Sequence, residues 1–118
     1  MRLNEVVYTN ALPVEGYGTG FFRIGGEAHR APLAILPEAG VIGWGGTDDT
    51  DLFLEAAGSI DVLLVGTGPE IAHLPQPFRT TLEEAGLGVE VMASPQACRT
   101  YNVLLGEGRR VGLALLPV

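Results

Sequence analysis

The feature that most constrains the fold is a nearly continuous run of apolar residues at 60–65, interrupted only by Asp61. A run of this length and composition is typical of a strand that is buried on both faces. Two more short apolar runs, at 89–92 and 111–116, follow it along the chain. Segments with helical spacing separate the three runs, so the second half of the chain predicts parallel strands joined by helical crossovers.

Three helices are expected around these strands, near residues 50–57, 77–85 and 95–105. The first follows a cluster of threonine and aspartate residues, which suits a helix N-terminus. The second ends at Gly86, a residue type that commonly lies just past a helix end. For the third, we predict that Ser94 caps the helix and that Pro95 occupies its first turn.

The first half of the chain is rich in glycine and in short apolar runs, at 33–36 and 41–44. Gly25 and Gly26 offer the pair of positive φ angles that a two-residue hairpin turn needs. Together the two halves predict an α/β fold in three layers, with helices packed on a central mixed sheet and a β-hairpin-rich N-terminal part. The length of 118 residues suits a single domain over residues 1–118.

The charge balance excludes several classes of function. The chain carries 14 acidic residues against seven arginines and no lysine, a formal net charge of −7. An acidic protein repels phosphate groups, so we expect no nucleic-acid partner and no binding to anionic membranes. The absence of lysine rules out Schiff-base chemistry and a phosphate-loop lysine. No apolar run has the length of a transmembrane segment and no targeting segment is recognisable, so a cytoplasmic location is expected.

Cys98 is the only cysteine, so no internal disulfide is expected. In the first turn of a helix its thiol pKa would be lowered, as in a nucleophile. A nucleophile also needs a base, and the only histidines, His29 and His73, lie in unrelated stretches. The alternative is a small apolar residue in the core, and we predict that Cys98 is buried and reacts slowly. No metal site and no catalytic residue are expected.

The turn Gly66-Thr67-Gly68 directly follows the buried strand and is the most suggestive motif. Glycines at the carboxyl end of a parallel strand bring backbone N–H groups close to a bound anion. Ile71 stands where a dinucleotide-binding loop has its third glycine, so no nicotinamide or flavin cofactor is expected. The turn is then either a simple tight turn or part of a pocket for another small ligand. That candidate ligand or anion pocket consists of Gly66, Thr67, Gly68, Arg99, Thr100 and Asn102.

The arginines near the C-terminus have two readings. Arg99 either forms a structural ion pair or lines the pocket with Thr67 and receives an anion. Because Arg109 and Arg110 adjoin an expected strand, alternation sends their side chains to opposite faces. We therefore predict that one of the two points inward and pairs with Glu107 or Glu90.

Three stretches carry a family resemblance: residues 60–68, residues 89–92, and above all the segment 97–111, Ala-Cys-Arg-Thr-Tyr-Asn-Val-Leu-Leu-Gly-Glu-Gly-Arg-Arg-Val. The chain resembles a widespread family of small α/β proteins that includes the mitochondrial respiratory complex I assembly factor 3 and the adipogenesis-associated domain protein. The resemblance implies a three-layer fold with a mixed five-stranded sheet and no established catalytic activity. It also implies a role exercised through protein contacts.

Two hypotheses about function follow. The first is a non-enzymatic protein-interaction or assembly factor with a protein partner, linked to the assembly of a membrane or respiratory complex. The second is a small-molecule or anion-binding protein, or an enzyme, that uses the Gly66-Thr67-Gly68 turn. A concave pocket with convergent polar groups at that strand end would favour the second hypothesis.

Overall fold

The structure is a computed structural model that describes residues 11–118. In chain order its elements are β2 (Val14–Gly18), β3 (Phe21–Ile24), β4 (Glu27–Arg30), β5 (Leu33–Leu36), β6 (Gly40–Gly43), α1 (Asp51–Glu55), β7 (Val62–Gly66), α2 (Gln76–Glu84), β8 (Gly88–Met92), α3 (Ser94–Gly106) and β9 (Val111–Leu115). The strands and helices predicted for the second half all form, with ends that differ by a residue or two.

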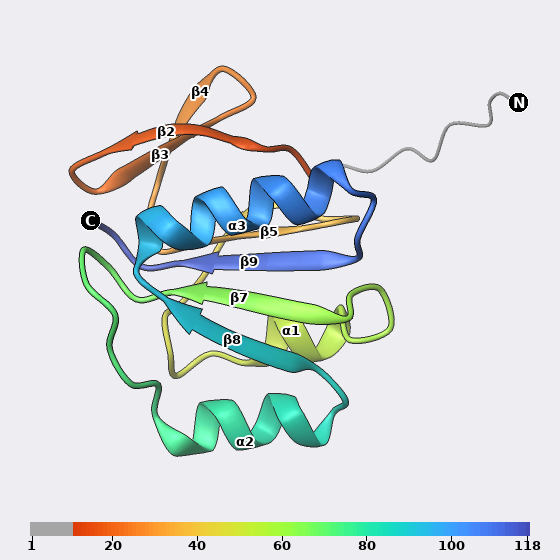
Figure 1. The fold of residues 1–118 in the computed structure, drawn as a ribbon. Coiled ribbons are helices and arrows are strands. Elements are labelled where there is room, and N and C mark those ends of the chain that lie inside the picture. The colour runs from red at the N-terminus through yellow and green to blue at the C-terminus, as the bar shows by residue number, and fades with distance from the viewer. Residues whose placement is uncertain (1–10) are drawn as a thin grey trace, which may run out of the picture.

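The five strands β6-β5-β9-β7-β8, in this order, make up the main sheet. β7 runs parallel to both β8 and β9, while β5 is antiparallel to β6 and β9. The expected mixed five-stranded sheet is therefore confirmed. The crossover from β7 to β8 leads toward the edge of the sheet, whereas the crossover from β8 to β9 leads back past β7. Because both connections are right-handed, their helices lie on opposite faces of the sheet. Figure 1 shows α2 and α3 on opposite sides of the sheet.

Side chains of the central strands alternate between two cores, as the strand period requires. Leu64 of β7 and Leu113 of β9 belong to the core beneath α3, together with Cys98 and Tyr101 of that helix. The neighbouring Leu63 belongs to the opposite core, which α1 and α2 cover. The central strands are thus buried on both faces, which explains why their sequences read as continuous apolar runs.

A second sheet of three antiparallel strands, β2-β3-β4, is built from the N-terminal half. The turn between β3 and β4 has Gly25 at φ 62° and Gly26 at φ 81°, which confirms the hairpin predicted there. Phe22 and Ile24 of β3 are buried in the core beneath α3. One outer layer therefore consists of α3 and this small sheet, and the other of α1 and α2 (Figure 1).

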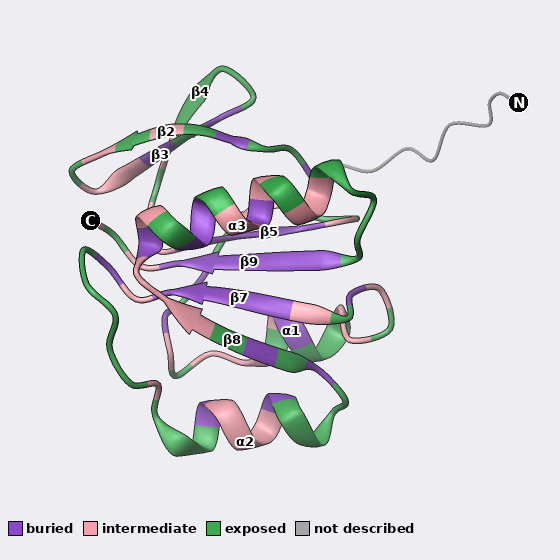
Figure 2. Cartoon of the chain, in the orientation of Figure 1, coloured by how far each residue is buried: buried purple, intermediate pink, exposed green. Residues whose placement is uncertain are grey.

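The main sheet is covered unevenly. α3 lies mainly over β7 and β9, and β8 forms one edge of the sheet. Figure 2 shows β9 buried along its length, whereas β8 alternates between buried and more exposed positions. Of the β8 side chains, Val89 is buried in the core beside α2, while Glu90 is exposed. This uneven cover leaves the β8 side of the sheet open to other molecules.

Candidate functional site

The Gly66-Thr67-Gly68 turn lies at the carboxyl end of β7, and its backbone groups are used within the chain. The Thr67 N–H donates to the Met92 carbonyl at 2.9 Å, and the Gly68 N–H donates to Ser94 Oγ at 2.9 Å. The Gly66 carbonyl accepts from the Leu116 N–H at 2.9 Å. These bonds tie the turn to the next strand, the next helix and the end of the chain, so its amides hold the structure together.

Ser94 plays a different role from the one predicted. It is the first residue of α3 rather than its cap, which is Ala93, and no side-chain capping bond forms there. The fully buried Ser94 Oγ accepts from the Gly68 N–H and donates to the Leu116 carbonyl at 2.8 Å. The hydroxyl therefore joins the ends of β7 and β9 beneath the helix, a role that a cap-like sequence does not reveal.

Thr67 organises the loop that leaves the turn. Its Oγ1 donates to the Glu70 carbonyl at 2.9 Å and accepts from the Ala72 N–H at 2.9 Å. A short polar side chain that bonds to the backbone a few residues on is a common way to stabilise a loop. Binding of an anion at this turn stays a prediction, and the bonds of Thr67 and Gly68 give the turn an internal structural role.

The other three residues of the predicted pocket lie on two sides of α3. Asn102 forms a matched pair of bonds with β2, since its Oδ1 accepts from the Val14 N–H and its Nδ2 donates to the Val14 carbonyl, both at 2.8 Å. A groove of about 240 Å³ lies between β2 and α3, and both Arg99 and Asn102 line it, beside Tyr17. Thr100 instead lines the groove next to β8. Arg99 and Asn102 are therefore neighbours, and Thr100 is separate from them.

The prediction that Arg109 or Arg110 points inward was wrong, and binding of an anion by Arg99 stays a prediction. Arg99 makes no ion pair with any residue of the described part, 11–118. Arg109 and Arg110 are both exposed and precede β9 rather than alternating within it. Arg110 pairs with Asp61, with Nη2 2.7 Å from Oδ1 and Nε 3.3 Å from Oδ2. This hydrogen bond holds the pKa of the Asp61 carboxyl below its usual value. Asp61 precedes β7, so only the strand pairing brings the partners together.

Cys98 is buried, as predicted, at 4% exposure on the inward face of α3. Burial raises the pKa of its thiol to about 12, although the nearby Arg99 opposes the shift. Neither His29 nor His73 lines the groove that Cys98 borders. The thiol is therefore held in its protonated form, which is the less nucleophilic one.

We expect Cys98 to react slowly with an alkylating reagent. A pKa near 12 in place of 9.0 leaves about a thousandfold less thiolate at about pH 8, before access is considered. The folded protein should react at least about a hundredfold more slowly than the protein unfolded in urea. Alkylation quenched at set times and followed by mass spectrometry measures both rates, and comparable rates would contradict the prediction.

Because the folded-state pKa is raised, the stabilising effect of the buried thiol should decline between about pH 9 and pH 12.

The largest of the pockets described is an open groove next to β8, which we call the β8 groove, with a volume of about 440 Å³. It lies on the α3 side of the sheet, over the strip that α3 leaves uncovered. Its floor is apolar and half-buried, and its rim carries charges of both signs. The residues that line it are Asp61, Val62, Leu64, Gly88, Glu90, Met92, Thr100, Leu104, Arg109 and Arg110.

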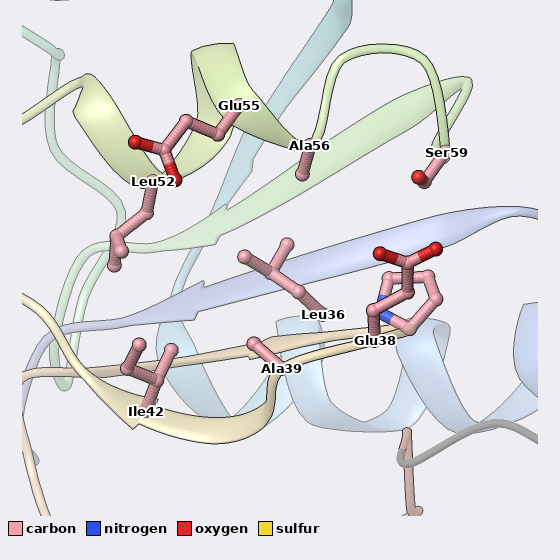
Figure 3. A pocket seen from close by; sticks show the side chains of 9 residues that line it. Leu36, Glu38, Ala39, Ile42, Leu52, Glu55, Ala56 and Ser59 are labelled. Carbon is pink, nitrogen blue, oxygen red and sulfur yellow. The ribbon is translucent and has the colours of Figure 1, made fainter.

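A second pocket, of about 200 Å³, lies on the opposite face between α1 and the turn that joins β5 to β6. Figure 3 shows Leu36, Ile42 and Leu52 forming its apolar wall. The carboxylates of Glu38 and Glu55 stand at its rim. It is smaller than the β8 groove and is not lined by the Gly66-Thr67-Gly68 turn.

Within residues 11–118, no group of three or more histidine, cysteine, aspartate or glutamate side chains is gathered so as to hold a metal ion. No helix in this part of the chain combines the length and the apolar character needed to cross a membrane.

The fold and the grooves define a three-layer α/β domain whose largest described groove lies along an edge strand. Residues 14–116 match the family described as a protein of unknown function (DUF498/DUF598), and the chain belongs to that family. It is 49% identical to an uncharacterized protein of Rhodobacter capsulatus, over all of this chain and 94% of that protein. The family predicted from the sequence is thus confirmed.

Two further similarities connect the chain to named proteins. It is 32% identical to human NADH dehydrogenase [ubiquinone] 1 alpha subcomplex assembly factor 3, over 91% of this chain and 61% of that protein. The chain thus spans about three fifths of that relative. The crystal structure of a Bartonella henselae protein described as an outer membrane protein is similar with a TM-score of 0.85 and 35% identity, over 95% of this chain and 99% of that chain.

Proposed function

We propose that this chain is a non-enzymatic assembly factor that binds a protein subunit of a respiratory complex through the β8 groove. The observation that carries the proposal is the groove itself, an open trough of about 440 Å³ with an apolar floor and a charged rim. This arrangement is the usual anatomy of a protein interface, in which an apolar centre is surrounded by polar residues. Small-molecule sites are generally more enclosed.

The floor of the groove offers apolar surface that the chain does not bury by itself. Val62, Met92 and Leu104 are only partly buried, although all three pack against the core beneath α3. A partner that covered them would gain roughly 25 cal/mol for each Å² of apolar surface removed from water. The rim presents Glu90 and Arg109, which make no ion pair within residues 11–118 and are free to select a complementary charge.

The relatives support the same proposal. The human relative is named an assembly factor of the NADH dehydrogenase, and this chain aligns with it over most of its own length. A factor that binds unassembled subunits needs an accessible surface, and the β8 groove provides one. We expect the chain to work in the cytoplasm, on a subunit that has not yet joined its complex.

Deletion of the gene in the organism that encodes this chain is expected to lower the amount of fully assembled NADH dehydrogenase. Partial complexes should accumulate, because their subunits would no longer be held in an assembly-competent form. Native gel electrophoresis with an in-gel NADH oxidation stain measures both species. Succinate dehydrogenase on the same gel is the control and should not change. A normal level of assembled NADH dehydrogenase in the deletion strain would overturn the proposed function.

Complementation then tests the surface. Arg109→Glu reverses a charge on the rim of the β8 groove, and we expect it to restore about a third or less of the assembled enzyme. Arg30→Glu makes the same change in net charge on β4, in the small sheet, and should restore it fully. Equal restoration by both variants would show that the β8 groove is not the surface in use.

A further inference from the structure

Among residues 11–118, β8 has one side that faces no other strand. The Gly88 N–H donates to the Asp61 carbonyl at 3.1 Å, and the Met92 carbonyl accepts from the Thr67 N–H at 2.9 Å. These bonds direct the backbone groups of Gly88, Glu90 and Met92 toward β7. Since alternate residues of a strand point their N–H and C=O groups to opposite sides, those of Val89 and Val91 point away from the sheet.

The two outward-facing residues differ in what covers them. The Val89 carbonyl accepts a hydrogen bond from Arg79 Nη2 at 3.0 Å, across from α2. The N–H and C=O of Val91 have no hydrogen-bond partner within residues 11–118. An unpaired donor and acceptor on an edge strand form a template on which another strand can pair. The open part of this edge is therefore centred on Val91.

The surface beside Val91 is hollow and apolar. A cavity of about 220 Å³ is lined by Val91 of the edge, by Ile71 and Leu74 of the loop before α2, and by Arg79. Ile71 is 67% exposed, an unusual position for a large apolar side chain. An apolar side chain that projects from a neighbouring strand on the α2 side of the sheet would enter this cavity.

We propose that β8 pairs with one extended segment of the protein partner, which adds a sixth strand to the main sheet. This inference rests on the proposed function and specifies how the partner binds. Backbone bonds to Val91 would supply the pairing, as in other complexes formed by strand addition. The added strand would lie between the β8 groove on one face and the Ile71 cavity on the other.

The side chains on either face of β8 specify the chemistry of that segment. Val91 points to the α2 side, so the partner residue opposite it is apolar and fills the space next to Ile71. Glu90 points to the groove side and makes no ion pair with residues 11–118, so the partner residue beside it is basic. The net charge of −7 also favours a basic segment. The expected partner sequence therefore alternates apolar and basic residues.

A second copy of this chain fits less well. Its own β8 carries Glu90 on the face where the site calls for a basic side chain. In the antiparallel register centred on Val91, Glu90 of each copy would lie opposite Met92 of the other copy and would meet no basic side chain. Both copies would also carry the same net charge of −7.

Arg79 limits how far the new strand extends. Its Nε is 3.1 Å from Glu83 Oε2 on the same helix, and its Nη2 covers the Val89 carbonyl. An antiparallel partner residue opposite Val91 forms both backbone bonds without touching Val89. Pairing that continues toward Val89 displaces the Arg79 guanidinium. Arg79 therefore blocks strand pairing at Val89, in the way that charged side chains often protect edge strands.

A labelled peptide tests the pairing directly. The probe alternates arginine with valine over about seven residues, and fluorescence anisotropy measures its binding to the intact protein. A second peptide has the same sequence with methylated valine backbone nitrogens, which removes the N–H groups but keeps charge and composition. We expect methylation to weaken binding about tenfold or more. Equal binding of the two peptides would overturn the proposal. A peptide that alternates glutamate with valine should bind more weakly than either, and tight binding of this acidic peptide would also contradict it.

Protein variants supply the matching test. Val91→Pro removes the outward N–H without touching the ladder to β7, and should weaken binding of the arginine–valine peptide about tenfold. Val91→Thr keeps the N–H and should bind within about threefold of the original chain. Arg79→Ala frees the Val89 carbonyl for pairing and should strengthen binding of the arginine–valine peptide. If Val91→Pro does not fold, the comparison of methylated and unmethylated peptides still decides.

Two more outcomes separate the alternatives. If sedimentation shows that the free chain is a dimer that Val91→Pro converts to a monomer, the edge binds a second copy and the proposal of a partner segment is overturned. Peptide binding is measured outside the cell, so it does not depend on the assembly role. Failure of strand pairing beside a clear deletion phenotype would leave the proposed function intact. Strand pairing without a deletion phenotype would overturn only the proposed function.

Discussion

Replacing Tyr101 with alanine is expected to lower the free energy of unfolding by about 4 kcal/mol, the largest single loss we anticipate. Tyr101 is fully buried between α3 and the main sheet, in the core that also contains Leu113. Removing the ring leaves a cavity that the rigid sheet cannot close. It also removes the hydroxyl that donates to the Leu12 carbonyl at 3.1 Å and so ties α3 to the segment before β2. Urea unfolding followed by circular dichroism measures the change.

Tyr101→Phe is the matched control because it keeps the ring and removes only the hydroxyl. We expect it to cost about 1 kcal/mol, the usual size of one partly buried hydrogen bond. If the alanine and phenylalanine variants lost the same amount, the hydroxyl rather than the ring would hold α3 in place. A loss below about 1 kcal/mol for Tyr101→Ala would contradict the packing described here.

Gly66→Ala is expected to destabilise the protein by about 3 kcal/mol and to lower its melting temperature by about 10 °C. A Cβ atom at position 66 would lie 2.7 Å from both Cα and Oγ of Ser94, and 2.9 Å from Leu115 Cδ2. The contact with a backbone atom cannot be relieved by rotating a side chain. The N-terminus of α3 would have to move away from the sheet, which would also break the hydrogen bonds of Ser94.

Gly43→Ala is the control for this prediction. Gly43 is the last residue of β6, as Gly66 is of β7, and a Cβ there meets nothing within 4 Å. We expect a change of at most about 0.5 kcal/mol for Gly43→Ala. Differential scanning calorimetry of the two variants compares them under one set of conditions. Similar melting temperatures would show that α3 does not need the close approach at Gly66.

The order of strands and helices in the second half was predictable because each central strand is covered on both faces. Because of this burial, residues 60–65 and 111–116 form nearly continuous apolar runs, which differ clearly from the helical spacing between them. The β3–β4 turn was predictable for another local reason, since Gly25 and Gly26 are both needed for positive φ angles. Patterns of this kind depend only on neighbours along the chain.

The arrangement around the strand ends was not predictable in the same way. Ser94 before a proline has the local pattern of a helix cap, yet its hydroxyl joins Gly68 to Leu116, residues that lie 26 and 22 positions away. Asp61 pairs with Arg110, 49 positions away, because β7 and β9 lie side by side in the sheet. Arg99, Thr100 and Asn102 lie within four consecutive positions of the sequence, but the helix directs them to two different grooves.

The sequence by itself determined the fold class, the family and the burial of Cys98, because apolar periodicity and turn residues act through local geometry and through the need to bury a core. Only the tertiary structure decided which surface stays open. β9 enters the sheet between β5 and β7, and α3 packs over β7 and β9. β8 is therefore left at the edge, where Val91 has no backbone partner within residues 11–118 and Glu90 is exposed. No local pattern in the segment Gly88–Met92 encodes that position, since strand order results from how distant segments pack together.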